Sequence, residues 1–68
     1  MSTTTVTVTG MTCDHCASSV REEIGRIPGV TRVLVDLASG RVDIDGDAPI
    51  ERDAVAAAVD EAGYQLAR

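Results

Sequence analysis

Apolar residues recur along this chain with two different spacings, and the order of these spacings limits the folds that it can adopt. Alternation with polar residues is typical of a half-buried strand, whereas recurrence every three or four residues gives a helix one apolar face. The alternating segments are residues 3–9, 30–37, 41–45 and 64–67. The segments with helical spacing are residues 16–27 and about 50–62. The chain is therefore expected to form four strands and two helices.

The order strand, helix, strand, strand, helix, strand predicts the α+β class with ferredoxin-like βαββαβ topology. Right-handed crossovers place both helices on one face of a four-stranded antiparallel sheet and leave the other face open to water. At 68 residues the chain is expected to be one small domain, spanning 1–68. It contains one Tyr and neither Phe nor Trp, so aliphatic residues must form the core. The expected core positions are Val6, Val8, Val20, Ile24, Val33, Val35, Val42, Ile44 and Leu66.

Charge and composition exclude several classes of function. Six basic and eleven acidic residues give a net charge of −5, which is the wrong sign for neutralising phosphates, so we expect no nucleic-acid partner. No apolar run has the length of a membrane span, and the N-terminus lacks the features of a secretory signal. We therefore expect a cytoplasmic protein without membrane insertion. Seven acidic residues lie between Asp43 and Glu61, where they are expected to form a solvated face.

The residues with distinctive chemistry lie in the segment Gly10–Cys16, between the first strand and the first helix. Cys16 is expected in the first helical turn and Cys13 just before it, where free backbone N–H groups and the positive helix end favour thiolates. The two residues between the cysteines let both sulfurs face one ion. Two soft thiolates without further protein ligands suit Cu(I), which accepts low coordination, better than Zn(II), which requires four ligands.

Two other interpretations of the cysteine pair have to be weighed. A structural zinc site needs two further ligands, and only His15 is available; between the cysteines at a helix start it is expected to be exposed and not bound to metal. A thiol redox motif also places cysteines at a helix start, but 68 residues are too few for the thioredoxin fold. In a reducing compartment both cysteines stay reduced, so metal binding and redox chemistry are the two candidates.

The segment Val6–Cys16, which ends in Gly-Met-Thr-Cys-x-x-Cys, resembles the heavy-metal-associated domains, and within that family the bacterial CopZ-type copper chaperones. Pro28-Gly29-Val30 after the first helix and Ala62-Gly63-Tyr64 after the second extend the resemblance over essentially the whole chain. The resemblance implies a βαββαβ carrier, not an enzyme. It also implies that the carrier binds Cu(I) through Cys13 and Cys16 and passes it to a copper-transporting P-type ATPase.

The resemblance implies roles for the residues around the two cysteines as well. In that family the equivalent of Met11 packs inward and supports the loop, and the aromatic residue that corresponds to Tyr64 lies beside the metal. Domains that serve zinc or cadmium pumps commonly have an acidic residue before the first cysteine. Here that position is Thr12, which favours a monovalent soft ion. Met11 as a third, thioether ligand is the alternative, although methionine more often fills a core.

Other proteins similar to this family provide the remaining alternatives. The same module occurs as the N-terminal domain of copper ATPases, but Met1 and an end shortly after Tyr64 favour a free-standing chaperone. Periplasmic mercury-binding proteins are similar but exported, and no export signal is expected here. Two copies of the chain are also expected to share copper at high loading, which gives a copper-bridged homodimer.

Overall fold

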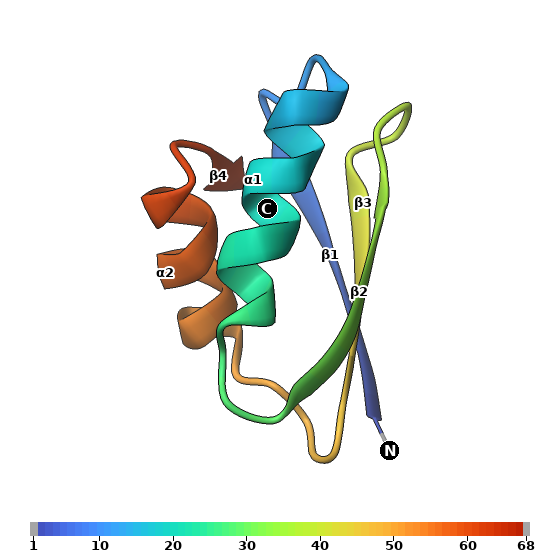
Figure 1. Cartoon of the computed structure of the whole chain (residues 1–68), viewed down its shortest axis with the longest axis vertical. Helices are drawn as coiled ribbons and strands as arrows, with labels where there is room; N and C mark the ends of the chain where they lie inside the picture. The colour runs from blue at the N-terminus through green and yellow to red at the C-terminus, as the bar shows by residue number, and fades with distance from the viewer. Residues whose placement is uncertain (1, 68) are drawn as a thin grey trace.

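The computed structural model describes residues 2–67, and within them the elements follow the expected βαββαβ order (Figure 1). The elements are β1 (Ser2–Thr9), α1 (Asp14–Gly25), β2 (Val30–Asp36), β3 (Arg41–Gly46), α2 (Arg52–Glu61) and β4 (Gln65–Leu66).

The strands form one four-stranded sheet in the order β2-β3-β1-β4, and every neighbouring pair is antiparallel. β1 and β3 are the central strands, whereas β2 and β4 are the edges. β1 pairs with β3 over most of its length but with β4 only at Val8 and Thr9. Both helices lie on the same face of this sheet (Figure 1). The predicted α+β, ferredoxin-like fold is therefore confirmed.

Both helices differ in their bounds from the sequence prediction. α1 begins earlier, at Asp14, and ends at Gly25, so that Ile27 lies in the following turn, where its N–H donates to the Ile24 carbonyl (3.0 Å). α2 begins at Arg52 and not near Ile50, because the preceding residue, Glu51, has extended backbone. Ile50 instead packs against the core from the connecting loop.

The edge strands are shorter than predicted. β2 ends at Asp36, and Leu37 lies outside it because Asp36 already begins the hairpin turn. The carboxylate of Asp36 accepts a hydrogen bond from the N–H of Ala38 (3.1 Å), and the carbonyl of Asp36 accepts one from the N–H of Gly40 (2.8 Å). Such a side-chain hydrogen bond two residues ahead is typical of aspartate in turns. β4 is reduced to Gln65 and Leu66.

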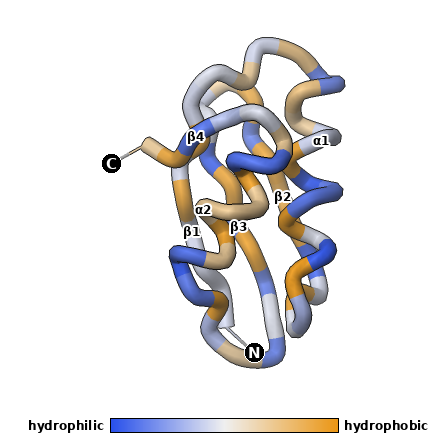
Figure 2. The backbone as a smooth tube through the Cα atoms, turned by 90° about the vertical axis from the view of Figure 1, so that its left-hand side faces the viewer, coloured by the Kyte–Doolittle hydropathy of each residue, from blue (hydrophilic) through white to orange (hydrophobic). Residues whose placement is uncertain are grey.

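The core is aliphatic and lies between the sheet and the two helices, where the apolar stretches of β1, β3 and α2 meet (Figure 2). Three of the predicted core residues, Val33, Val35 and Leu66, are only half-buried, because they belong to the edge strands. Residues of α2 complete the core in their place. The buried residues are Val6, Val8, Val20, Ile24, Val42, Ile44, Val55, Ala58 and Val59.

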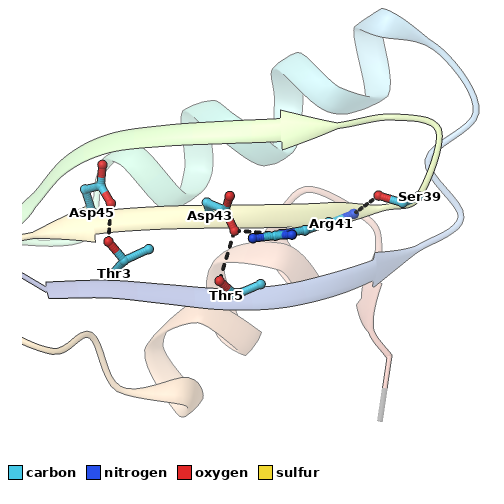
Figure 3. Close-up of polar contacts among 6 residues, drawn as sticks. All are labelled: Thr3, Thr5, Ser39, Arg41, Asp43 and Asp45. Atoms are coloured by element: carbon cyan, nitrogen blue, oxygen red, sulfur yellow. Dashed lines mark hydrogen bonds and ion pairs between the residues drawn. The ribbon is translucent and has the colours of Figure 1, made fainter.

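The other face of the sheet is open and carries a row of polar cross-strand contacts (Figure 3). The hydroxyl of Thr3 donates to Asp45 (2.7 Å) and that of Thr5 to Asp43 (2.9 Å). The guanidinium Nε of Arg41 also donates to Asp43 (3.0 Å). Opposite partners on neighbouring strands stabilise the pairing of β1 with β3 at this wet surface. The same contacts to Arg41 and Thr5 hold the pKa of Asp43 below its ordinary value of 3.8.

Replacement of Asp43 by Asn tests this row of contacts. A carboxyl whose pKa is lowered by folding stabilises the fold fully above its unfolded pKa and loses that contribution as the pH falls through the folded value. We therefore expect the melting temperature of the wild type to fall more than that of Asp43→Asn as the pH drops below 3.8. Melting curves followed by circular dichroism measure this, with Asp47→Asn in an exposed turn as the matched control. Parallel curves for the wild type and Asp43→Asn contradict the expectation.

Candidate metal centre

The two cysteines lie at one end of the molecule, in and just after the loop that leads from β1 into α1. Gly10 ends β1 with a positive φ of 89°, a conformation that favours glycine. A Cβ atom added there would lie 3.4 Å from Cδ1 of Tyr64, at van der Waals contact, so the tyrosine ring lies beside the start of the loop. The loop is therefore held between the end of a central strand and a ring that comes from the other end of the chain.

Cys13 and Cys16 bring their sulfurs together across the start of α1. Cys13 is the N-cap and Cys16 lies in the first turn, and their Sγ atoms are 3.2 Å apart. Both are free thiols; Cys13 is exposed and Cys16 is half-buried. The carbonyl of Cys13 accepts the first helical hydrogen bond, from Ala17 (3.1 Å), but its side chain does not cap the helix. The Cys13 sulfur is thus free to bind a ligand.

The Cys16 thiol is acidified by its surroundings. Hydrogen bonds lower its pKa from 9.0 to about 6; the largest effect comes from the Tyr64 side chain, followed by the backbone of Thr12 and the thiol of Cys13. The same contact with Cys16 raises the pKa of Tyr64, so the tyrosine stays a hydrogen-bond donor. Hydrogen bonds to an anion favour the ionised form, so the surroundings of Cys16 favour its thiolate at neutral pH. The backbone of Thr12 and Cys13, just before the helix, contributes to this effect, but the tyrosine contributes more.

Tyr64 is positioned by the way in which α2 ends. Gly63 has a φ of 92°, and its N–H donates to the carbonyl of Asp60 (2.9 Å), while the N–H of Tyr64 donates to that of Val59 (3.0 Å). These two bonds form a Schellman motif, which ends a helix with a left-handed glycine. The ring of Tyr64 then packs against the hydrophobic core on one side and faces the cysteine loop on the other.

A Gly63→Ala substitution tests whether the left-handed conformation of Gly63 ends α2. Within residues 2–67, and apart from chain neighbours and the backbone of the same helix, no atom lies within 4 Å of an added Cβ at Gly63 or Gly25. Of these two glycines only Gly63 has a positive φ. We expect Gly63→Ala to lower the free energy of unfolding by about 1 kcal/mol, because alanine is strained there. The matched change Gly25→Ala, in a helix, should raise it by about 0.5 kcal/mol. Urea unfolding measures both, and equal effects of the same sign contradict the assignment.

The other residues singled out in the sequence lie around the sulfurs at different depths. Met11 is half-buried and packs against the core. Thr12 is exposed, with its Oγ1 4.0 Å from the Sγ of Cys16, and His15 is exposed on the first turn of α1. Within residues 2–67, no three side chains of His, Cys, Asp or Glu come together as a set of metal ligands.

The seven acidic residues between Asp43 and Glu61 are exposed or half-buried, as expected of solvated residues, but they do not form one face. Asp43 and Asp45 lie on the open face of the sheet, bound to threonines. Asp47 follows β3, and Glu51 and Asp53 lie at the start of α2. All three are at the end of the sheet away from the cysteine loop. Only Asp60 and Glu61, in the last turn of α2, lie near Tyr64 in the chain. The folded topology therefore disperses the charge that is concentrated in the sequence.

The model of the heavy-metal-associated domain matches residues 5–65, nearly the whole chain. The chain belongs to this family. This heavy-metal-associated domain is 37% identical over 65 residues to the copper chaperone CopZ of Bacillus subtilis, and the match covers 94% of each chain. It is 41% identical over 58 residues to mercuric reductase of Serratia marcescens, of which the match covers 13%.

Among solved structures, the domain is similar to a copper-binding domain from HMA7, a P-type ATPase. The TM-score is 0.88 and the identity 29%, over 98% of this chain and 92% of the other. Domains of this family thus occur as separate small proteins and as parts of larger ones. Within residues 2–67, neither helix of the present domain has the length and apolar character that a membrane crossing demands.

The contact between Tyr64 and Cys16 is the feature of this heavy-metal-associated domain that the local sequence does not indicate. Tyr64→Phe removes the hydroxyl and keeps the ring, so we expect the pKa of Cys16 to rise from about 6 toward 9.0. Ultraviolet absorbance of the thiolate, recorded on the reduced protein across this pH range, measures the change. Cys16→Ser should abolish the low-pH step in the titration. An unshifted step in Tyr64→Phe contradicts the role of the hydroxyl.

Proposed function

We propose that this chain is a cytoplasmic Cu(I) chaperone, a carrier and not an enzyme, formed by one heavy-metal-associated domain over residues 1–68. It binds Cu(I) through Cys13 and Cys16 and hands it to a copper-transporting P-type ATPase by thiolate exchange. The observation that carries the proposal is the pair of free sulfurs 3.2 Å apart at an accessible helix start. The end-to-end match with a copper chaperone supports it.

The donor set favours Cu(I) over harder or more highly coordinated ions. Thiolates are soft ligands, and Cu(I) is bound well by few of them, whereas Zn(II) in proteins is almost always held by four ligands. A metal must displace the protons of the thiols that bind it. Because the pKa of Cys16 is lowered to about 6, its deprotonation costs less at neutral pH than that of an ordinary thiol.

Four neighbouring residues shape the site without binding the metal. Met11 anchors the loop to the core, and Thr12 leaves no carboxylate beside the first cysteine. Tyr64 lowers the pKa of Cys16, and the exposed His15 stays unligated. The site therefore holds the ion by two sulfurs and keeps its outer side accessible.

Transfer follows from the different exposure of the two cysteines. A partner thiolate attacks the bound ion from the exposed side, where Cys13 lies, and forms a three-coordinate intermediate. One of the protein's own sulfurs then dissociates, and Cys16, held by Tyr64 and the helix start, remains bound longer. The number of thiolates bound to the ion rises from two to three and then returns to two, so copper is never free in solution. The same geometry lets two copies share copper at high loading, as a copper-bridged homodimer.

The partner is supported by the family resemblance and by the fold of a known relative. A copper-binding domain of a P-type ATPase has the same fold as this chain, with a TM-score of 0.88. Asp60 and Glu61 lie in the last turn of α2, next to the residues that lead to Tyr64, and are placed to attract a basic partner surface. The alternatives are an N-terminal domain of such an ATPase and a thiol redox protein.

Double replacement of the cysteines tests the carrier function. We expect Cys13→Ser with Cys16→Ser to lose at least a hundredfold in Cu(I) affinity, because serine oxygens are poor ligands for a soft ion. The fold should be retained, since neither cysteine belongs to the buried core. Competition with a Cu(I) chelator measures affinity under reducing conditions, and circular dichroism measures the fold. High-affinity binding by the variant contradicts the site, and a wild type that binds no Cu(I) but exchanges disulfides supports the redox alternative.

Stopped-flow transfer to an acceptor domain with a Cys-x-x-Cys motif completes this test. Ligand exchange predicts a rate that increases with acceptor concentration, because the acceptor thiolate attacks the bound ion. A rate equal to the spontaneous loss of copper and independent of the acceptor rules out this route.

A further inference from the structure

β2 is an edge strand whose outer side is unpaired in the chain. Within residues 2–67 it pairs with β3 alone, so its second row of backbone N–H and C=O groups faces outward. Its pairing with β3 is irregular between Val30 and Arg32 and regular from Arg32 to Asp36. The straight part of this edge is therefore the segment Arg32–Asp36, with Leu34 at its centre.

The side chains of this segment are arranged symmetrically about Leu34. Leu34 is 48% exposed and is the large hydrophobic residue that the described chain leaves in water. On either side of it, Val33 and Val35 are half-buried, and beyond them Arg32 and Asp36 are exposed. Arg32 and Asp36, which carry opposite charges, thus each lie two residues along the strand from Leu34.

Such a segment is complementary to itself when two copies run antiparallel. If Leu34 faces Leu34 of the second copy, each Arg32 faces an Asp36 and each Val33 faces a Val35. A shift that centres the pairing on Val33 or Val35 sets Leu34 against a charged residue, and a one-residue slip sets the open face against the helix side. One register therefore matches apolar with apolar and positive with negative side chains.

We propose that two copies of this chain associate through their β2 edges, antiparallel and centred on Leu34, to form a continuous eight-stranded sheet. The backbone groups of β2 gain partners, and opposite charges and apolar pairs face each other across the junction. Charged residues normally protect an edge from such pairing. Here their opposite signs, equally distant from Leu34, make the edge specific for a second copy.

The surface around β2 has room for this neighbour on both sides of the sheet. One shallow hollow, on the open face, is lined by Leu34, Asp36, Arg41 and Asp43 together with Val35. A second lies between α1 and the strand and is lined by Arg21 and Gly25 of the helix and by residues 30–33. Both hollows border the same edge. In the register centred on Leu34, Leu34 of the second copy lies beside the first hollow and its Val35 beside the second.

The geometry keeps this association separate from metal binding. The twofold axis passes between the two Leu34 residues, perpendicular to the sheet, and reverses the strand direction, so the two cysteine loops lie at opposite ends of the dimer. The proposal does not rest on the proposed function. It predicts a dimer that forms without copper and without either cysteine, which distinguishes it from a copper-bridged pair.

The first test uses the metal-free wild type with a chelator and a thiol reductant. Sedimentation equilibrium over a wide range of protein concentration should show a weak, reversible monomer–dimer equilibrium, as expected for a small interface. Amide chemical shifts recorded over the same range should change in β2 and not in β4. A protein that stays monomeric throughout, or shift changes that avoid β2, overturns the proposal.

Two charge reversals provide the sharper test. Arg32→Asp sets like charges opposite each other twice in the dimer, and so does Asp36→Arg; each should weaken self-association by about tenfold. Mixed together, the two variants should form a heterodimer at the wild-type affinity, because each negative edge then faces a positive one. Arg26→Asp, at the exposed end of α1, is the matched control and should leave the equilibrium unchanged.

Leu34→Arg removes the central contact without altering the core and should make the chain monomeric. Circular dichroism confirms that each variant folds, which is necessary because Arg32 and Asp36 also face Asp45 and Arg41 of β3 within one chain. Unchanged dimerisation of Leu34→Arg, or failure of the two folded charge variants to associate with each other, overturns the proposal.

Discussion

The pairing of β1 with β3 is the interaction on which the rest of this structure depends. These two strands are central, and their inward residues Val6, Val8, Val42 and Ile44 are buried against the helices. Hydrogen bonds from threonines to aspartates hold the same two strands together on the wet side. The cysteine loop continues directly from β1. Because β1 is held on both of its faces, the position of the cysteine loop at its end is fixed as well.

The periodicity of the sequence was sufficient to predict the elements of the fold, but it could not predict which strands lie at the edges. Val33 and Val35 alternate as regularly as Val42 and Ile44, yet they are half-buried because β2 has a neighbour on one side only. Strand order depends on pairing between distant segments, and a local pattern contains no record of it. For the same reason, acidic residues that are close in sequence are dispersed in the fold.

In the candidate site, too, some features follow from residues that are close in sequence, whereas others depend on residues far apart in the chain. The relation of Cys13 to Cys16 is local, since three residues along a helix start bring two side chains to one side. The acidity of Cys16 is largely not local, because its main cause is the side chain of Tyr64, at the far end of the chain. Only the family resemblance indicated that tyrosine in advance. Its place is fixed by Gly63 and the last turn of α2, which the Gly-Tyr pair alone does not reveal.

The N-cap of α1 is a cysteine whose side chain does not cap the helix. Serine or aspartate at an N-cap stabilises a helix by about 1 kcal/mol, which is a considerable part of the stability of so small a domain. Substitution of Cys13 by serine or aspartate would therefore stabilise the fold but remove one of the two sulfurs. Selection for stability favours this change, whereas selection for the pair of sulfurs opposes it. In a duplicated copy that no longer needs both sulfurs, position 13 should therefore be among the first to change. In a set of related chains, serine at the N-cap with an intact Cys16 would identify copies that keep the fold but have lost the pair of sulfurs.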